Sequence, residues 1–193
     1  SVTVLLPAVK GLDAAHVLEA IAEGLFLSNY SFDRYKTGGG DNGKVLLKSA
    51  VFLTGEKKAA SILKKVSIVS RNTLLCRDLI NEISEKSDPL GIAREARALG
   101  RLPGVTCTVY GLKEIEKMKM GLMLAVNKGS RRPPALVVLA YRGNHRSKNF
   151  FSVIGKGITF DSGGMNLKPS GHIEDMRTDM AGAAAALFTL KSV

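Results

Sequence analysis

Four ionisable side chains near the end of the sequence have types and spacings that suit a reactive centre: Lys156, Asp161, Lys168 and Asp179. They lie in a glycine-rich stretch that begins Gly-Lys-Gly-Ile-Thr-Phe-Asp-Ser-Gly-Gly at residue 155. Each of them taken alone would be a capping or surface residue. Two lysines and two aspartates that converge on one glycine-rich edge indicate a site, because such groups gather where a protein binds or transforms a ligand.

The two carboxylates have local surroundings that favour ligand binding. Gly163 and Gly164 follow Asp161 closely and let the backbone approach whatever that carboxylate binds. We expect Asp179 in the first turn of the last helix, where the positive end of the helix dipole keeps a carboxylate ionised. The sequence therefore predicts a site built on strand ends and glycine-rich loops.

The elements that must position this site alternate between strands and helices. This alternation predicts an α/β protein with a largely parallel sheet. Asp13 is a plausible cap for the first helix, and Asp88 with Pro89 begins a helix that Gly100 ends. The predicted strands cover residues 2–6, 45–53, 105–110, 135–141 and 150–154. The predicted helices cover residues 13–27, 56–84, 89–99 and 113–126, with a last one that starts near Met176 or Thr178.

The spacing of the four residues resembles the signature of the leucyl aminopeptidase (cytosol aminopeptidase) family of two-metal peptidases. In that family the first Asp, the second Lys and the second Asp follow the first Lys by 5, 12 and 23 residues, as they do here. Residues 119–130 and 77–81 also resemble family segments. The resemblance is specific from about residue 71 to 193 and weak in the part of the chain before it.

This resemblance implies a role for each residue. Lys156 would be an amine ligand of one metal, Asp179 a carboxylate ligand of the same metal, and Asp161 the carboxylate that bridges both metals and helps to bind substrate. Lys168 would bind no metal but would donate to the scissile carbonyl oxygen and stabilise the oxyanion. Two divalent ions, Zn or Mn, would activate water and hold the free α-amine of a peptide, so that N-terminal, leucine-like residues are released.

The sequence departs from the family pattern in one respect. The family's remaining ligands lie in a later Asp-Ala-Glu-Gly-Arg segment, which these 193 residues do not contain. One metal would have three ligands, namely Lys156, Asp161 and Asp179. The other metal would have only the bridging Asp161. We therefore expect this chain alone to bind metal poorly and to be inactive. Ser1 at the start and the unclosed helical pattern at Val193 suggest that both ends are truncated.

The resemblance also implies how the chain is divided. Residues 1–55 would form part of a small N-terminal α/β domain, and residues 56–87 a linking helix. Residues 88–193 would be the first part of an α/β catalytic domain whose central sheet is mixed and mainly parallel. The family implies a hexamer, which we carry over as an expectation.

Composition limits the alternatives. Two cysteines fit a reducing compartment, such as the cytoplasm or an organelle, and no apolar run is long enough to span a membrane. The net charge is +11, and residues 101–150 hold ten basic and two acidic residues. A non-catalytic basic module in a nucleoprotein assembly is therefore the alternative function. It would use Lys128, Arg131, Arg132, Arg142, Arg146 and Lys148.

Two other motifs fail on context. Residues 38–44 nearly match a phosphate-binding loop, but Val45 stands where Ser or Thr belongs and a strand follows instead of a helix, so a hairpin or surface loop is the better interpretation. Asp161-Ser162-Gly163-Gly164 is similar to the nucleophile segment of chymotrypsin-like proteases. Phe160 stands where that segment has Gly, and His16 belongs to an amphipathic helix, so we reject a Ser-His-Asp triad.

Overall fold

The computed structural model describes residues 1–37 and 46–193. The hairpin or surface loop predicted for residues 38–44, and Val45 at the start of a predicted strand, lie outside the described residues. The chain divides into two compact units, one of Ser1–Leu75 with Ser192 and one of Cys76–Lys191 with Val193. The domain boundaries predicted at residues 55 and 87 stay a prediction.

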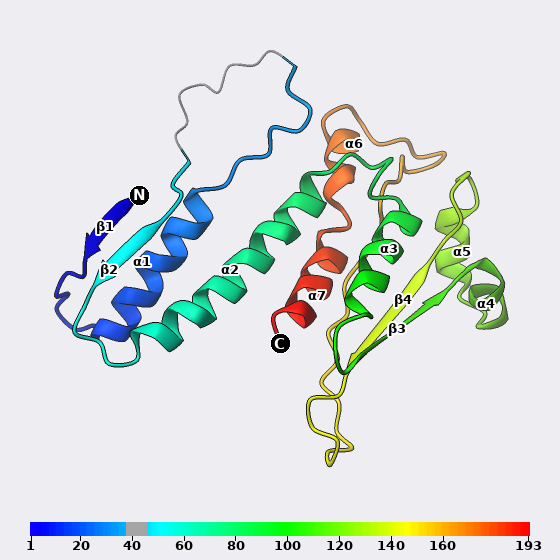
Figure 1. The fold of residues 1–193 in the computed structure, drawn as a ribbon. Helices are drawn as coiled ribbons and strands as arrows, with labels where there is room; N and C mark the ends of the chain where they lie inside the picture. The colour runs from blue at the N-terminus through cyan, green and yellow to red at the C-terminus, as the bar shows by residue number, and fades with distance from the viewer. Residues whose placement is uncertain (38–45) are drawn as a thin grey trace. The chain divides into compact units, whose positions relative to one another are not determined.

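The first unit is a small α/β unit. Strand β1 (Val2–Leu5) pairs in parallel with β2 (Ala50–Leu53), as Figure 1 shows. Helix α1 (Ala14–Ser28) begins as predicted, because the side chain of Asp13 accepts a hydrogen bond from the backbone N–H of His16 at 2.8 Å. Its buried residues are Val17, Leu18 and Ala22.

Helix α2 (Ala59–Asn81) belongs to both units. It is shorter at both ends than the helix predicted for residues 56–84. Its predicted apolar stripe is only partly buried: Val66 is buried, whereas Val69 and Leu75 are exposed. The Lys65 ammonium lies 2.8 Å from the Glu19 carboxylate of α1 in the first unit.

The second unit is built around helix α3 (Pro89–Leu99), helix α7 (Ala181–Lys191) and a pair of strands. Helix α3 starts at the predicted cap, where the Asp88 side chain accepts from the Gly91 N–H at 2.6 Å. Strand β3 (Val105–Tyr110) pairs antiparallel with β4 (Leu136–Tyr141). Helices α3 and α7 pack together in one apolar cluster (Figure 1). The buried members of the cluster are Ile92, Ala96, Leu99, Met180, Ala184, Leu187 and Phe188.

The α/β class predicted from the sequence is confirmed, and the sheets are mixed in sense: one pair is parallel and the other antiparallel. The strand predicted for residues 150–154 is wrong. That segment carries no strand assignment, because no neighbouring strand in the described part of the chain forms a ladder with it, and its apolar side chains are exposed.

Two predicted helices are also divided. The helix predicted for residues 113–126 is split into α4 (Leu112–Lys117) and α5 (Gly121–Asn127), because Lys119 adopts a left-handed φ of 56° between them. The helix predicted to start near Met176 or Thr178 is preceded by α6 (His172–Asp175) and the 3₁₀ turn η1 (Met176–Thr178), and α7 itself starts later.

None of the helices within residues 1–37 and 46–193 is both long and apolar enough to cross a membrane.

Candidate functional site

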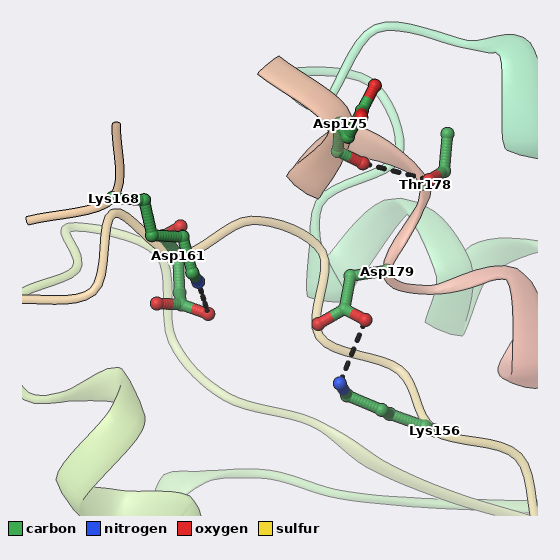
Figure 2. Close-up of polar contacts among 6 residues, drawn as sticks. All are labelled: Lys156, Asp161, Lys168, Asp175, Thr178 and Asp179. Atoms are coloured by element: carbon green, nitrogen blue, oxygen red, sulfur yellow. Dashed lines mark hydrogen bonds and ion pairs between the residues drawn. The ribbon is translucent and has the colours of Figure 1, made fainter. Parts of the chain in front are cut away.

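The four predicted residues form two ion pairs in the second unit, drawn in Figure 2. Lys156 Nζ donates to Asp179 Oδ1 at 2.8 Å, although the two residues are 23 positions apart in the sequence. Lys168 Nζ donates to Asp161 Oδ2 at 2.7 Å and, at 3.3 Å, to the main-chain oxygen of the same residue. The structure thus brings the candidates together as two lysine–aspartate pairs.

Asp179 lies just before α7 and not in its first turn, which corrects the sequence prediction. It ends η1, and its N–H donates to Met176 O at 3.2 Å. Its side chain is 25% exposed, whereas that of Lys156 is 63% exposed. The carboxylate is therefore held by a short turn of the backbone, and the longer amine reaches towards it.

The main chain beside Lys156 is fixed to the start of α7. The N–H of Ala183 donates to Lys156 O at 2.8 Å. The lysine carbonyl therefore satisfies one of the first N–H groups of the helix, which have no partner inside it. Lys156 and Asp179 are consequently both positioned by the same helix end.

A tight loop holds the second pair. The N–H of Lys168 donates to Ser162 O at 2.9 Å, which brings the lysine back to Asp161. Gly163 has a φ of +90°, and a Cβ there would lie 2.4 Å from Asn166 O, so the loop requires glycine at that position. The Gly163 N–H also donates to Asp161 Oδ1 at 2.7 Å.

These contacts stabilise the ionised form of Asp161. The hydrogen bond from Lys168 is the main cause that lowers its pKa below the ordinary value. The Gly163 N–H and the charges of Lys168 and Lys156 act in the same direction, whereas partial burial opposes them. Asp161 is therefore a carboxylate within the electrostatic reach of both lysines.

The chemistry of these groups suits part of a metal site. Two ligands that bind one divalent ion at about 2.1 Å in tetrahedral geometry lie about 3.4 Å apart. Lys156 Nζ and Asp179 Oδ1, which form an ion pair at 2.8 Å, would therefore move apart slightly to share an ion. Within the described ranges, no group of three or more His, Cys, Asp or Glu side chains is arranged to hold a metal. The residues present fit part of the ligand set of a metal centre, namely one lysine and one aspartate, and not a complete set.

The glycines that bring these segments together were not predicted from the sequence. A Cβ on Gly155 would lie 2.4 Å from Gly182 O, so the backbone before Lys156 touches the backbone of α7. The sequence signal for this contact was the glycines themselves, which lie on both sides of Lys156 and in Met-Ala-Gly after Asp179. Only the contact in space shows that two of them face each other.

The basic residues of the alternative function have different surroundings. Arg132 is engaged with acidic groups of its own unit, at 3.3 Å from Asp88 and 3.6 Å from Glu85. Arg142, Arg146 and Lys148 lie in an exposed turn after β4. Arg132 is therefore already paired with carboxylates of its own unit.

Comparison with protein-family models shows that the chain belongs to the cytosol aminopeptidase family. The family model for the catalytic domain matches residues 74–193, and that for the N-terminal domain matches residues 1–39.

Two relatives illustrate the similarity, and both are named probable cytosol aminopeptidase. The protein from Protochlamydia amoebophila is 37% identical over 192 residues, which are 98% of this chain and 38% of the relative. The protein from Aquifex aeolicus is 34% identical over 193 residues, which are all of this chain and 38% of the relative. The chain thus spans less than half of the length of these relatives.

A solved structure is similar to nearly the whole chain. The bottromycin maturation enzyme BotP in complex with Mn matches with a TM-score of 0.79 and 30% sequence identity. The match covers 98% of this chain and 40% of that enzyme.

Proposed function

We propose that the whole protein is a metal-dependent aminopeptidase that releases N-terminal residues, preferably leucine-like ones, from peptides. Membership of the cytosol aminopeptidase family supports this activity. The observation that carries it is the Lys156–Asp179 contact of 2.8 Å, which brings together an amine and a carboxylate that could share one metal.

In this proposal three residues hold metal. Lys156 and Asp179 would hold the same ion, and Asp161 would be a ligand of both ions. The Lys156 amine must give up a proton before it can bind, because only its neutral form has a lone pair. When bound, the two divalent ions, Zn or Mn, would activate a water molecule and polarise the scissile carbonyl group. The solved complex of BotP with Mn, which is similar to nearly all of this chain, supports a divalent ion here.

Lys168 acts on the substrate in this proposal. Its ammonium, which contacts Asp161 at 2.7 Å in the structure, turns to the oxygen of the scissile carbonyl. A charged donor aimed at that oxygen stabilises the negative charge that develops there. Asp161 then also lies next to the bound peptide, as a substrate-binding residue.

The 193 residues alone are proposed to be inactive. Lys156, Asp161 and Asp179 give an incomplete set of ligands, and the resemblance assigns the others to an Asp-Ala-Glu-Gly-Arg segment that is not present here. A hexameric assembly and a cytoplasmic location are further proposals, and the relatives' name supports the location. The nucleoprotein alternative is not favoured, because the comparisons point to a peptidase family.

The test is hydrolysis of leucine amide by the whole protein, with Mn²⁺ or Zn²⁺ present. We expect activity that depends on the metal and falls by about 10²–10³-fold in Lys168→Ala, as for the loss of an oxyanion donor. Asp161→Ala should also lose activity, together with metal affinity. An unchanged rate in both variants would refute the residue assignments, and a wild-type protein that cleaves no aminoacyl substrate would refute the function.

A further inference from the structure

Two glycines face each other where the segment of Lys156 meets helix α7. A Cβ on Gly155 would lie 2.4 Å from Gly182 O and 2.6 Å from the Cα of Ala183. A Cβ on Gly182 would lie 2.9 Å from Lys156 N and 3.3 Å from Lys156 O. Real Cβ atoms essentially never approach other heavy atoms within 3.0 Å, so neither position has room for a side chain.

The requirement at both positions is space and not backbone conformation. Neither glycine has a φ in the left-handed region that only glycine adopts easily, unlike Gly163 nearby. The atoms that a side chain would meet belong to the backbone and cannot rotate away. Glycine is needed at these positions because the two main chains touch.

This contact lies directly beside the Lys156–Asp179 pair. Gly155 is covalently bonded to Lys156, and the Lys156 carbonyl accepts the Ala183 N–H at 2.8 Å. Asp179 is three residues before Gly182, on the turn that leads into α7. The same backbone contact therefore fixes both ends of a pair whose side chains meet at 2.8 Å.

We propose that the Gly155–Gly182 contact is a positioning element that sets the separation of Lys156 and Asp179, and thereby the affinity of the metal site that they share. The inference rests on the proposed function for the identity of the ligand. The geometric part, that the glycine contact sets the distance between the main chains of the two residues, stands without it.

The size of the perturbation follows from the distances. Ordinary contact begins at 3.4 Å. A methyl group at residue 155 must therefore displace Gly182 O by about 1 Å, and one at residue 182 must displace Lys156 N by about 0.5 Å, to restore van der Waals separation. Ligands must be held within about 0.5 Å of their productive positions. Gly182→Ala is thus the milder variant and Gly155→Ala the more severe one.

Gly157 offers a matched control on the other side of Lys156. A Cβ there would meet only the Ala183 side chain, at 3.3 Å. Gly157→Ala adds the same methyl group to the same segment without a collision between main chains. If Gly157→Ala has a small effect, Ala183→Gly should remove it, because it deletes the atom that the new methyl group meets.

The experiment measures the affinity of the whole protein for Mn²⁺ by isothermal titration calorimetry, in variants whose thermal unfolding shows that they are folded. We expect affinity to fall by about tenfold or more in Gly155→Ala and Gly182→Ala, as it does when groups that orient metal ligands are lost. Gly157→Ala should stay within about threefold of wild type. Raised Mn²⁺ should restore the activity of Gly182→Ala, since its ligands are displaced but present. Wild-type affinity in folded Gly182→Ala overturns the proposal.

Crystal structures of the metal-free Gly182→Ala and Gly157→Ala proteins provide the second readout. The distance between the Cα atoms of Lys156 and Asp179 should increase by about 0.5 Å in the first variant, because the new methyl group must displace Lys156 N by that much to reach van der Waals separation. In the second variant the distance should stay unchanged. An unchanged distance in Gly182→Ala overturns the positioning role. If the wild-type protein binds no divalent ion, the proposed metal function fails, whereas this geometric comparison still decides whether the glycine contact positions the pair.

Discussion

Asp88 combines two interactions that can be separated by mutation. Its Oδ1 caps helix α3 by accepting the Gly91 N–H at 2.6 Å, and its Oδ2 lies 3.3 Å from a guanidinium nitrogen of Arg132. The carboxylate side chain is only 10% exposed, whereas that of Arg132 is 52% exposed. We expect the cap to contribute more than the ion pair.

The magnitudes follow from these surroundings. Loss of an N-cap side chain lowers the free energy of unfolding by about 1 kcal/mol. A half-exposed ion pair contributes about 0.5 kcal/mol, because water screens it. Asp88→Ala removes both interactions and should lower the free energy of unfolding by about 1.5 kcal/mol. Asp88→Asn keeps an oxygen acceptor for Gly91 and loses only the charge, so its effect should be about 0.5 kcal/mol.

Urea unfolding followed by circular dichroism measures these differences. The control is Arg132→Gln, which removes the same ion pair from the other side. In its presence Asp88→Asn should have almost no further effect, since paired residues are not additive. If Asp88→Asn destabilises the protein as much as Asp88→Ala does, the charge and not the cap stabilises the helix start, and the reasoning is refuted.

Three further predictions concern the core, the acid response and the metal. Met180 is fully buried beside the site, and its loss would leave a cavity. Met180→Ala should therefore lower the free energy of unfolding by about 2–5 kcal/mol; thermal or urea unfolding measures this, and a change below about 1 kcal/mol would contradict it. The hydrogen bond from the His16 N–H holds the pKa of Asp13 below its ordinary value. The stability that this gives is present above the unfolded pKa of about 3.9 and is lost as the pH falls through the lower folded pKa. The free energy of unfolding of Asp13→Asn should therefore fall less steeply than that of wild type as the pH is lowered. An equally steep fall in both proteins would contradict this prediction. EDTA should abolish hydrolysis by the whole protein and Mn²⁺ should restore it, and activity that survives chelation would exclude the proposed metal chemistry.

Local signals in the sequence predicted much of the second unit. Asp88 and Pro89 marked a helix start because capping depends on neighbouring residues, and the structure places α3 there. The β-branched run at residues 105–110 predicted strand β3 with its observed bounds. These elements depend on interactions within a few residues, which the sequence displays directly.

The remaining features depend on contacts between distant residues. The resemblance puts Lys156 and Asp179 on one metal, but nothing in the sequence shows the direct contact of Lys168 with Asp161, which depends on how the loop folds back. Asp179 was predicted in the first turn of the last helix. The sequence has no capping or breaking residue between Asp179 and Ala181, so it does not show that η1 ends before α7 begins. The spacing identified the candidates and the resemblance grouped two of them, whereas the contacts between the side chains follow from packing.

Residues 150–154 have a consequence for how the protein behaves in concentrated solution. Phe151 and Ile154 are 93% and 96% exposed, and the stretch from Asn149 to Gly155 contains neither proline nor a charged side chain. Exposed segments of this composition readily add to the strands of other molecules. The light scattered per unit mass of the 193-residue chain should therefore increase as its concentration rises. Phe151→Lys should delay that aggregation by placing a gatekeeping charge on the segment.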